Sequence, residues 1–202
     1  IDEKGLLTEE LKNNILKAQK LSEVEDYYRP FKEKKKTKAS IAKAKGLEPF
    51  ALSILKLPRE FHLELEAQKY LTEEVLTIED AIQGAKDIIA EQISDEARYR
   101  KYTKDMIYKT GLMTTHVKKK NPDEDGVYQM YYEKVQYIAS HRILAINRAE
   151  KEKVLTVAIE IDQERFMTYI YNGVMRKRES TLSELIMECV KDAFKRLIFP
   201  SV

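Results

Sequence analysis

Residues 77–93 read TIEDAIQGAKDIIAEQI, and this stretch decides the fold class. After Thr77, the apolar residues recur at three- and four-residue spacing: Ile78, Ala81, Ile82, Ala85 and Ile89. That spacing places them along one face of a helix, where they form a stripe that has to be buried. The stretch therefore predicts a long amphipathic helix around which other elements pack.

Cap residues and apolar stripes of the same kind predict helices elsewhere in the chain. Their predicted N-terminal residues include Thr8, Ser22, Thr37, Ser94 and Thr181. The predicted helices cover residues 8–18, 22–29, 37–45, 49–57, 94–110, 140–151, 164–177 and 181–198. The last of them has an apolar stripe formed by Leu182, Leu185, Ile186, Cys189, Ala193 and Leu197. Residues 21–57 thus hold three short helices joined by tight turns.

The period changes after Gly111. Residues 112–118, 128–138 and 155–161 suit strands, because apolar and polar residues alternate there. Residues 121–126, NPDEDG, have the composition of a turn. We expect a single compact, mainly α unit: a multi-helix domain with helix-turn-helix-like short helices and a small β element over residues 112–162.

The composition supports a folded helical protein and excludes several classes. With 43% hydrophobic and 35% charged residues over 202 positions, the chain has enough apolar surface for a core. Only 6 Gly and 5 Pro argue against a turn-dense β protein. No apolar run is long enough to span a bilayer, and a lone cysteine, Cys189, fits the cytoplasm. Because the chain starts at Ile1 and not at Met, we expect a fragment of a longer protein.

Positive charge is concentrated in residues 29–45, which we call the basic segment. It holds eight cations against one anion, Glu33, although the whole chain has a net charge of only +2. Its cations are Arg29, Lys32, Lys34, Lys35, Lys36, Lys38, Lys43 and Lys45. Lysines neutralise phosphates with a salt-sensitive affinity that does not depend on base sequence, so the segment is a candidate nucleic-acid-binding surface. The alternative is a solvated loop, which is common in lysine-rich proteins.

No arrangement of residues indicates catalysis. The three histidines His62, His116 and His141 are scattered, and no pair of His or Cys has metal-ligand spacing. Phosphate-binding glycine motifs and a nucleophile elbow are absent, and Cys189 lies on an apolar helical stripe. We therefore expect no enzymatic activity, no cofactor and no metal site.

A polar group begins the predicted helix at Ser140. His141 and Arg148 fall roughly on one side of that helix and could form a site. The preferred interpretation is structural: His141 and Arg142 occupy the first turn and hold a neighbouring element or domain in place.

Three blocks of the chain resemble the Tex family of bacterial transcription accessory proteins. They are VEDYYRPFK with KTKASIAKAKGLEPFA at residues 24–32 and 36–51, SHRILAINRAEKEKVL at 140–155, and FKRLIFPS at 194–201. The blocks occur in the family's order and together span nearly the whole chain. Two residues depart from the family pattern: Phe31 stands where Tyr is expected, and Ala149 where Gly is expected.

The resemblance implies a larger protein, with a helical N-terminal region followed by a ribonuclease-H-like domain, a helix-hairpin-helix element and an OB-fold RNA-binding domain. It also implies kinship with a eukaryotic transcription elongation factor. Residues 1–202 would be part of the N-terminal helical region, without the downstream domains.

The implied role is a non-catalytic scaffold that binds RNA or DNA, weakly on its own, in the cytoplasm. The alternative is a structural or protein-interaction module that docks neighbouring domains or the transcription machinery.

Overall fold

The computed structural model describes residues 5–32, 36–118 and 131–202, and it divides the chain into two compact units. Unit 1 comprises Ile1–Lys101 and Glu164–Val202, and unit 2 comprises Tyr102–Gln163. The mainly α fold class predicted from the sequence is confirmed, whereas the single compact unit was wrong. The predicted turn at residues 121–126 lies outside the described residues.

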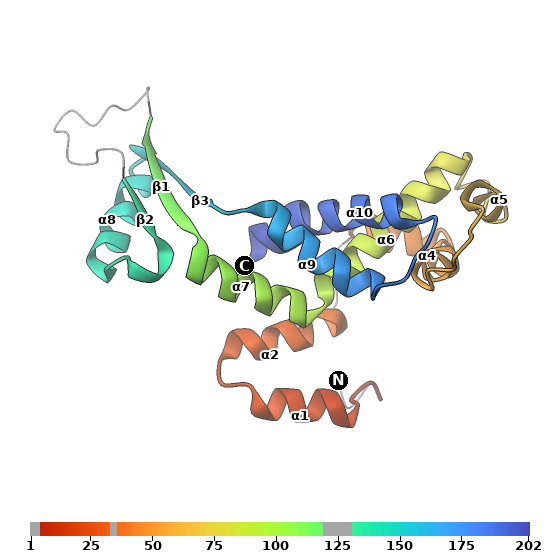
Figure 1. Ribbon diagram of the computed structural model, residues 1–202, viewed down its shortest axis with the longest axis horizontal. Helices are drawn as coiled ribbons and strands as arrows, with labels where there is room; N and C mark the ends of the chain where they lie inside the picture. Colours follow the sequence, from red (N-terminus) through yellow and green to blue (C-terminus); the bar gives the residue numbers. More distant parts are fainter. Residues whose placement is uncertain (1–4, 33–35, 119–130) are drawn as a thin grey trace. The chain divides into compact units, whose positions relative to one another are not determined.

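Unit 1 is helical (Figure 1). Its first helices are α1 (Glu9–Lys17), α2 (Leu21–Tyr28), the 3-10 turn η2 (Arg29–Phe31), α3 (Lys38–Ala44), α4 (Glu48–Leu55) and α5 (Leu63–Gln68). They are followed by α6 (Ile78–Asp95), the start of α7 (Ala97–Thr110), nearly all of α9 (Gln163–Met175) and α10 (Ser183–Asp192). A π-helical stretch, η4 (Ala193–Ile198), and a 3-10 turn, η5 (Phe199–Ser201), end the chain.

The helix predicted from residues 77–93 is the centre of unit 1. The elements that pack against α6 include α3, α4, α5, α10, η4 and η2. Its Ala81, Ala85, Ile88 and Ile89 are fully buried, so the stripe seen in the sequence is the core face. The apolar stripe predicted for the last helix is buried as well. Its final residue, Leu197, lies in the π-helical stretch η4 and is half-buried.

Of the N-caps predicted from the sequence, Thr8 and Thr37 are confirmed. The predictions for Ser22, Ser94 and Thr181 were wrong. Thr8 accepts a hydrogen bond from Leu11 N at 3.2 Å, as an N-cap should. Ser22 lies inside α2 because Glu23 reaches back to Gln19 N at 2.9 Å and starts the helix earlier. Ser94 belongs to the last turn of α6, where its hydroxyl donates to the Glu91 carbonyl at 2.8 Å.

The third wrong cap is Thr181. Its hydroxyl accepts a hydrogen bond from Phe61 N at 3.1 Å, and α10 begins at Ser183. The side chain thus holds a distant loop and does not cap the helix that follows it.

Unit 2 contains a three-stranded antiparallel sheet with the order β2-β1-β3. The strands are β1 (Leu112–Val117), β2 (Tyr132–Lys134) and β3 (Leu155–Glu160), with the 3-10 turn η3 (Val135–Tyr137) and the helix α8 (Ser140–Lys151) between β2 and β3. In the register, Met113 pairs with Glu133 on one side and with Ile159 on the other. Helix α8 packs against β3 and buries Ile146 and Ala149.

Of the predicted strand 128–138, residues 128–130 lie outside the described residues, and the strand covers only Tyr132–Lys134 of the remainder. Its pairing ends where Val135 N donates to the Gly111 carbonyl at 2.9 Å, at the junction of α7 and β1. The segment before Gly111 is the helix α7, so β2 has no further strand to pair with. The chain therefore turns into η3. A Cβ on Gly111 would lie 2.5 Å from the Ile107 carbonyl oxygen, which explains why glycine makes this change of structure possible.

Candidate nucleic-acid interface

The basic segment folds around α3. Thr37 and Ser40 form a capping box, in which Ser40 N donates to Thr37 Oγ1 at 3.0 Å and Thr37 N donates to Ser40 Oγ at 2.8 Å. Gly46, with φ of +80°, ends the helix in a left-handed conformation, which glycine adopts readily. The segment is thus a short, firmly bounded helix that carries lysines.

Helix α3 is fixed to the core of unit 1 through small residues. Ala39 and Ala42 are buried, and Gly84 of α6 lies directly opposite. A Cβ on Gly84 would be 2.4 Å from Leu47 Cδ1 and 3.3 Å from Ala42 Cβ, so an alanine there would require the Leu47 side chain to move and α3 to shift slightly. The lysines therefore project from a rigid base.

The described cations of the basic segment fall into two groups. Arg29 is half-buried beside Asp95, with 3.5 Å between Arg29 Nε and Asp95 Oδ1, and Lys43 pairs with Glu48 at 3.1 Å. Lys34 and Lys35 lie outside the described residues. The remaining members are exposed and have no hydrogen bond or ion pair with another described residue: Lys32, Lys36, Lys38 and Lys45.

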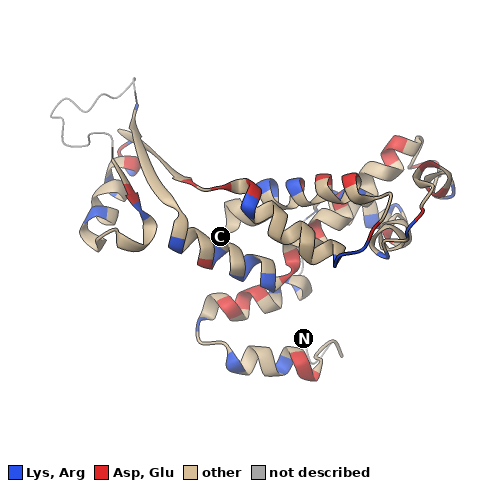
Figure 2. Ribbon diagram, in the orientation of Figure 1, with Lys and Arg blue, Asp and Glu red and all other residues tan. Residues whose placement is uncertain are grey.

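Acidic side chains border part of this surface. Lys38 and Lys45 line a groove of about 210 Å³ between α3 and α6, together with Asp80 and Asp87. Burial raises the pKa of the Asp87 carboxyl, while the Lys38 ammonium and the Arg196 guanidinium act in the opposite direction. In Figure 2, helix α10 likewise carries residues of both signs.

The polar group on α8 has the structural arrangement preferred from the sequence. Arg142 Nη1 donates to Glu133 of β2 at 2.6 Å, and the Tyr131 hydroxyl donates to the same carboxylate. These hydrogen bonds, from Tyr131 first and then Arg142, lower the pKa of Glu133. Arg148 pairs with Glu152 of the same helical end at 2.9 Å.

The single cysteine lies in the core and is chemically quiet. Cys189 is 1% exposed, and burial raises the pKa of its thiol to about 12. Such a thiol carries almost no thiolate near neutral pH and is a poor nucleophile. Among the described residues, no group of three or more His, Cys, Asp or Glu is placed to hold a metal ion.

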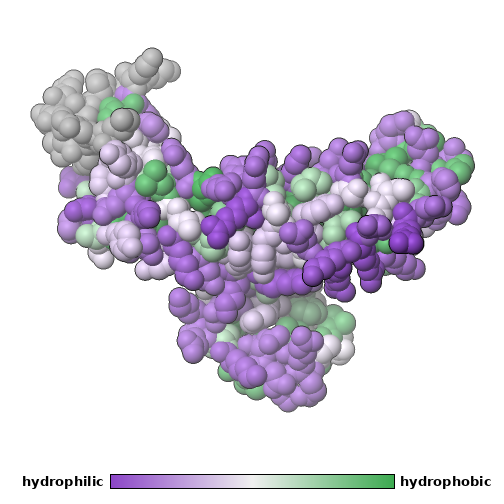
Figure 3. Space-filling model, viewed as in Figure 1, coloured by the Kyte–Doolittle hydropathy of each residue, from purple (hydrophilic) through white to green (hydrophobic). Residues whose placement is uncertain are grey.

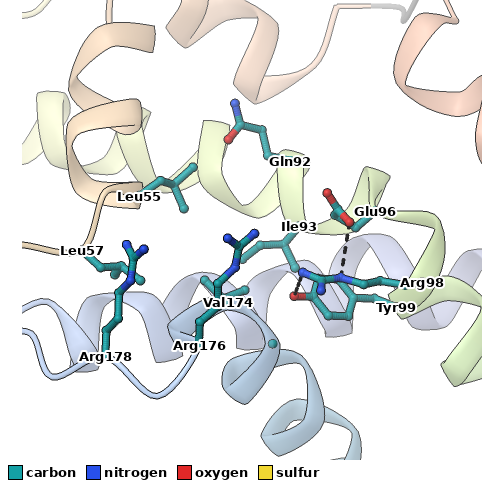
Figure 4. Close-up of a pocket in the computed structure, with 11 residues that line it drawn as sticks. Leu55, Leu57, Gln92, Ile93, Glu96, Arg98, Tyr99, Val174, Arg176 and Arg178 are labelled. Carbon is teal, nitrogen blue, oxygen red and sulfur yellow. Dashed lines mark hydrogen bonds and ion pairs between the residues drawn. The ribbon is translucent and has the colours of Figure 1, made fainter. Parts of the chain in front are cut away.

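Unit 1 contains a pocket of about 250 Å³ that the sequence did not predict. We call it the arginine pocket because Arg98, Arg176 and Arg178 line it together with Leu55, Leu57 and Val174 (Figure 4). The available signal was the run Arg176-Lys177-Arg178 at the end of a predicted helix. Nothing in the sequence joined that run to residues more than a hundred positions away.

Comparison with known proteins defines the class of protein. A family model described as "Tex central region-like" matches residues 59–199. The transcriptional accessory protein Tex of Neisseria gonorrhoeae is 32% identical over 163 residues, which cover 79% of this chain and 21% of that protein. The chain belongs to the Tex family.

Other relatives show the same partial coverage. The uncharacterized protein YdcI of Bacillus subtilis (strain 168) is 46% identical over 208 residues, covering 100% of this chain and 29% of the relative. The human S1 RNA-binding domain-containing protein 1 is 29% identical over 219 residues, covering 99% and 22%. This chain therefore spans less than a third of the length of each of these relatives. No helix in its described part is long and apolar enough to cross a membrane.

Proposed function

We propose that this chain is a non-catalytic scaffold and nucleic-acid-binding region of a transcription accessory protein, and that its basic segment contacts phosphates without reading base sequence. The observation that carries the proposal is the set of exposed lysines without ion-pair partners among the described residues: Lys32, Lys36, Lys38 and Lys45. Exposed ammonium groups can replace the counterions that surround a nucleic acid. Membership of the Tex family, and the RNA-binding domain in the name of the human relative, support this role.

The side chains of the basic segment favour phosphate contact over base recognition. Bidentate recognition of a base edge is typical of arginine, and the one arginine of the segment, Arg29, is held beside Asp95. Lysines act as point charges that do not distinguish one base from another. We therefore expect similar affinities for different sequences and a strong dependence on salt.

The predicted helix-turn-helix-like unit would consist of α3 and α4, which residues 45–47 join. In DNA-binding proteins of this kind the second helix enters the major groove. Here α4 buries Phe50, Ala51 and Ile54 in the core, while the exposed lysines lie on α3 and its flanks. The proposed contact is therefore made by α3 and the adjoining loop along the backbone of the nucleic acid. Because bacterial transcription takes place in the cytoplasm, we place the protein there.

The experiment that tests this function replaces the four exposed lysines with glutamine in the full-length protein. RNA and duplex DNA binding are then titrated against a control with the same change of charge elsewhere. Four exposed lysines outside the basic segment provide that control: Lys151, Lys153, Lys191 and Lys195. The proposal requires weaker binding of all sequences by the first variant alone.

A second candidate function, docking of neighbouring domains or of the transcription machinery, is favoured by an observation in unit 2. Tyr132, Tyr137 and Leu144 are 71%, 67% and 70% exposed, so each could contribute to an apolar contact with a partner. Unit 1 also has apolar surface around α5, seen in green in Figure 3, where Leu65 is 61% exposed. Replacing Tyr137 and Leu144 with serine distinguishes the two functions. Docking predicts altered domain contacts with unchanged nucleic-acid affinity.

A further inference from the structure

The arginine pocket combines positive charge with an aliphatic wall. Leu55 and Leu57 come from the end of α4 and the following turn, and Val174 from α9. Arg176 and Arg178 follow α9, and in Figure 4 their guanidinium groups extend to the same side, beside Leu57. Glu96 is the single carboxylate in the lining, against three arginines. A ligand that fits must be anionic and partly apolar.

Arg98 is already engaged and closes one end of the arginine pocket. Its Nη2 donates to the Tyr99 hydroxyl at 2.8 Å, its Nε lies 3.4 Å from Glu96, and its guanidinium carbon is 4.6 Å from the centroid of the Tyr99 ring. Tyr99 is 2% exposed, so its ring offers no face to a ligand. The charge that remains available comes from Arg176 and Arg178.

The backbone conformation just after α9 accompanies the placement of these two arginines in the lining of the arginine pocket. Arg176 and Lys177 both have positive φ, 49° and 61°, a conformation that is uncommon outside glycine and turns the chain back towards α4. Arg178 Nη1 donates to the Lys56 carbonyl at 2.9 Å, which uses one of its five N–H donors. The Arg176 guanidinium has no hydrogen bond or ion pair with any residue in 5–32, 36–118 or 131–202.

We propose that the arginine pocket binds a short acidic segment of a protein partner, with a carboxylate on Arg176 and Arg178 and an aliphatic side chain on Leu55, Leu57 and Val174. Guanidinium groups pair with carboxylates through two parallel hydrogen bonds. An apolar contact beside such a pair is typical of the buried anchors of protein interfaces.

A nucleic acid fits the arginine pocket less well, because single-stranded nucleic acids are held largely by bases stacked on exposed aromatic rings. The one aromatic residue in the lining is Tyr99, which Arg98 covers. The aliphatic wall offers a base no comparable partner, whereas it suits Leu, Ile or Val of a peptide.

This site is separate from the proposed phosphate contact, since no residue of the basic segment lines the arginine pocket. Replacing Lys32, Lys36, Lys38 and Lys45 should therefore leave peptide binding unchanged. Failure of either proposal can be recognised without reference to the other.

The test uses the full-length protein and a fluorescent dodecapeptide that repeats Asp-Leu-Glu. An Asn-Leu-Gln version and a twelve-nucleotide oligouridylate serve as comparison probes. The variant is Arg176→Gln, and its matched control is Lys177→Gln, because Lys177 has the same left-handed conformation and exposure but does not line the pocket. Binding is measured by fluorescence anisotropy.

We expect Arg176→Gln to weaken binding of the acidic peptide about tenfold, as for loss of a charge-assisted hydrogen bond, and Lys177→Gln to leave it within about twofold. The neutral peptide should not bind. Absence of saturable binding by the unmodified protein, or equal losses in both variants, would overturn the proposal. Loss of oligouridylate binding in Arg176→Gln, with no acidic-peptide binding, would reassign the arginine pocket to nucleic acid.

Discussion

Arg100 Nε donates a hydrogen bond to Asp26 Oδ1 at 2.7 Å, and the two side chains are only 4% and 11% exposed. The same guanidinium donates to Ser201 Oγ at 2.9 Å and to the Ser201 carbonyl at 3.2 Å. One side chain on α7 thus joins α2 and the last turn of the chain, η5, within unit 1. These segments are far apart in sequence.

Removing this arginine should destabilise unit 1 strongly. Arg100→Met removes the guanidinium from this buried ion pair, and breaking such a pair typically costs about 3–5 kcal/mol. The adjacent Lys101 provides a matched control, because it pairs with Glu23 at 3.8 Å with side chains 62% and 30% exposed. Lys101→Met should cost at most about 1 kcal/mol. Urea unfolding measures both, and equal effects would show that the Asp26–Arg100 pair does not hold α2 in place.

The cap of α3 offers a second test of how the basic segment is held. Thr37→Ala removes the side-chain acceptor for Ser40 N and should lower stability by about 1 kcal/mol. Ser22→Ala is the comparison, since the sequence suggests a cap at Ser22 but the structure places it inside α2 without a capping hydrogen bond. Its cost should be within about 0.5 kcal/mol. A larger loss for Ser22→Ala than for Thr37→Ala, measured by thermal unfolding, would contradict the capping described.

The predicted caps show which contacts can be predicted from the sequence and which cannot. Thr8 and Thr37 were predicted correctly because a cap bonds to a backbone group three residues away, and such a pattern can be read locally. Thr181 bonds instead to Phe61, 120 residues away. Asp26 and Arg100 are 74 residues apart. Tertiary partners of this kind override a local preference, and no local pattern reveals them.

The candidate site shows the same division. The lysines of the basic segment stood out in the sequence because they are contiguous, yet only the structure shows that Arg29 and Lys43 have carboxylate partners. The arginine pocket was missed because the α4 turn and the segment after α9 meet only in the folded chain. Charges that lie close together in the sequence can be predicted. Whether they have ion-pair partners, and whether charges from distant segments come together, depends on packing.

The buried thiol makes Cys189 a probe of global unfolding. With its pKa raised to about 12, it should resist alkylation by iodoacetamide at about pH 8 in the folded protein and react readily once unfolded. Because the folded pKa exceeds the ordinary thiol pKa of 9.0, unfolding releases a proton above that pH. Stability should then fall as pH rises above about 9, by up to about 1.4 kcal/mol per pH unit from this group.

Alkylation is followed by mass spectrometry with and without urea, and Cys189→Ala reports the part of the alkaline slope that other groups cause. Rapid modification of the folded protein would show that the C-terminal end of α10 opens on its own. An alkaline slope identical in Cys189→Ala would show that the thiol does not contribute.

The proposed function is neutralisation of phosphates by the exposed lysines of the basic segment. It predicts that glutamine at Lys32, Lys36, Lys38 and Lys45 weakens binding of RNA and duplex DNA of any sequence. It also predicts a shallower dependence of log affinity on log salt. The slope should fall by about 0.9 per lost contact on duplex DNA and about 0.7 on single strands, for up to about four contacts.

The most direct measurement is that salt slope, determined between about 50 and 200 mM salt for the full-length protein, the basic-segment variant and the variant at Lys151, Lys153, Lys191 and Lys195. We predict a reduced slope in the basic-segment variant and an unchanged slope in the control. Identical slopes and affinities in all three proteins would contradict the account and leave residues 29–45 as a solvated segment.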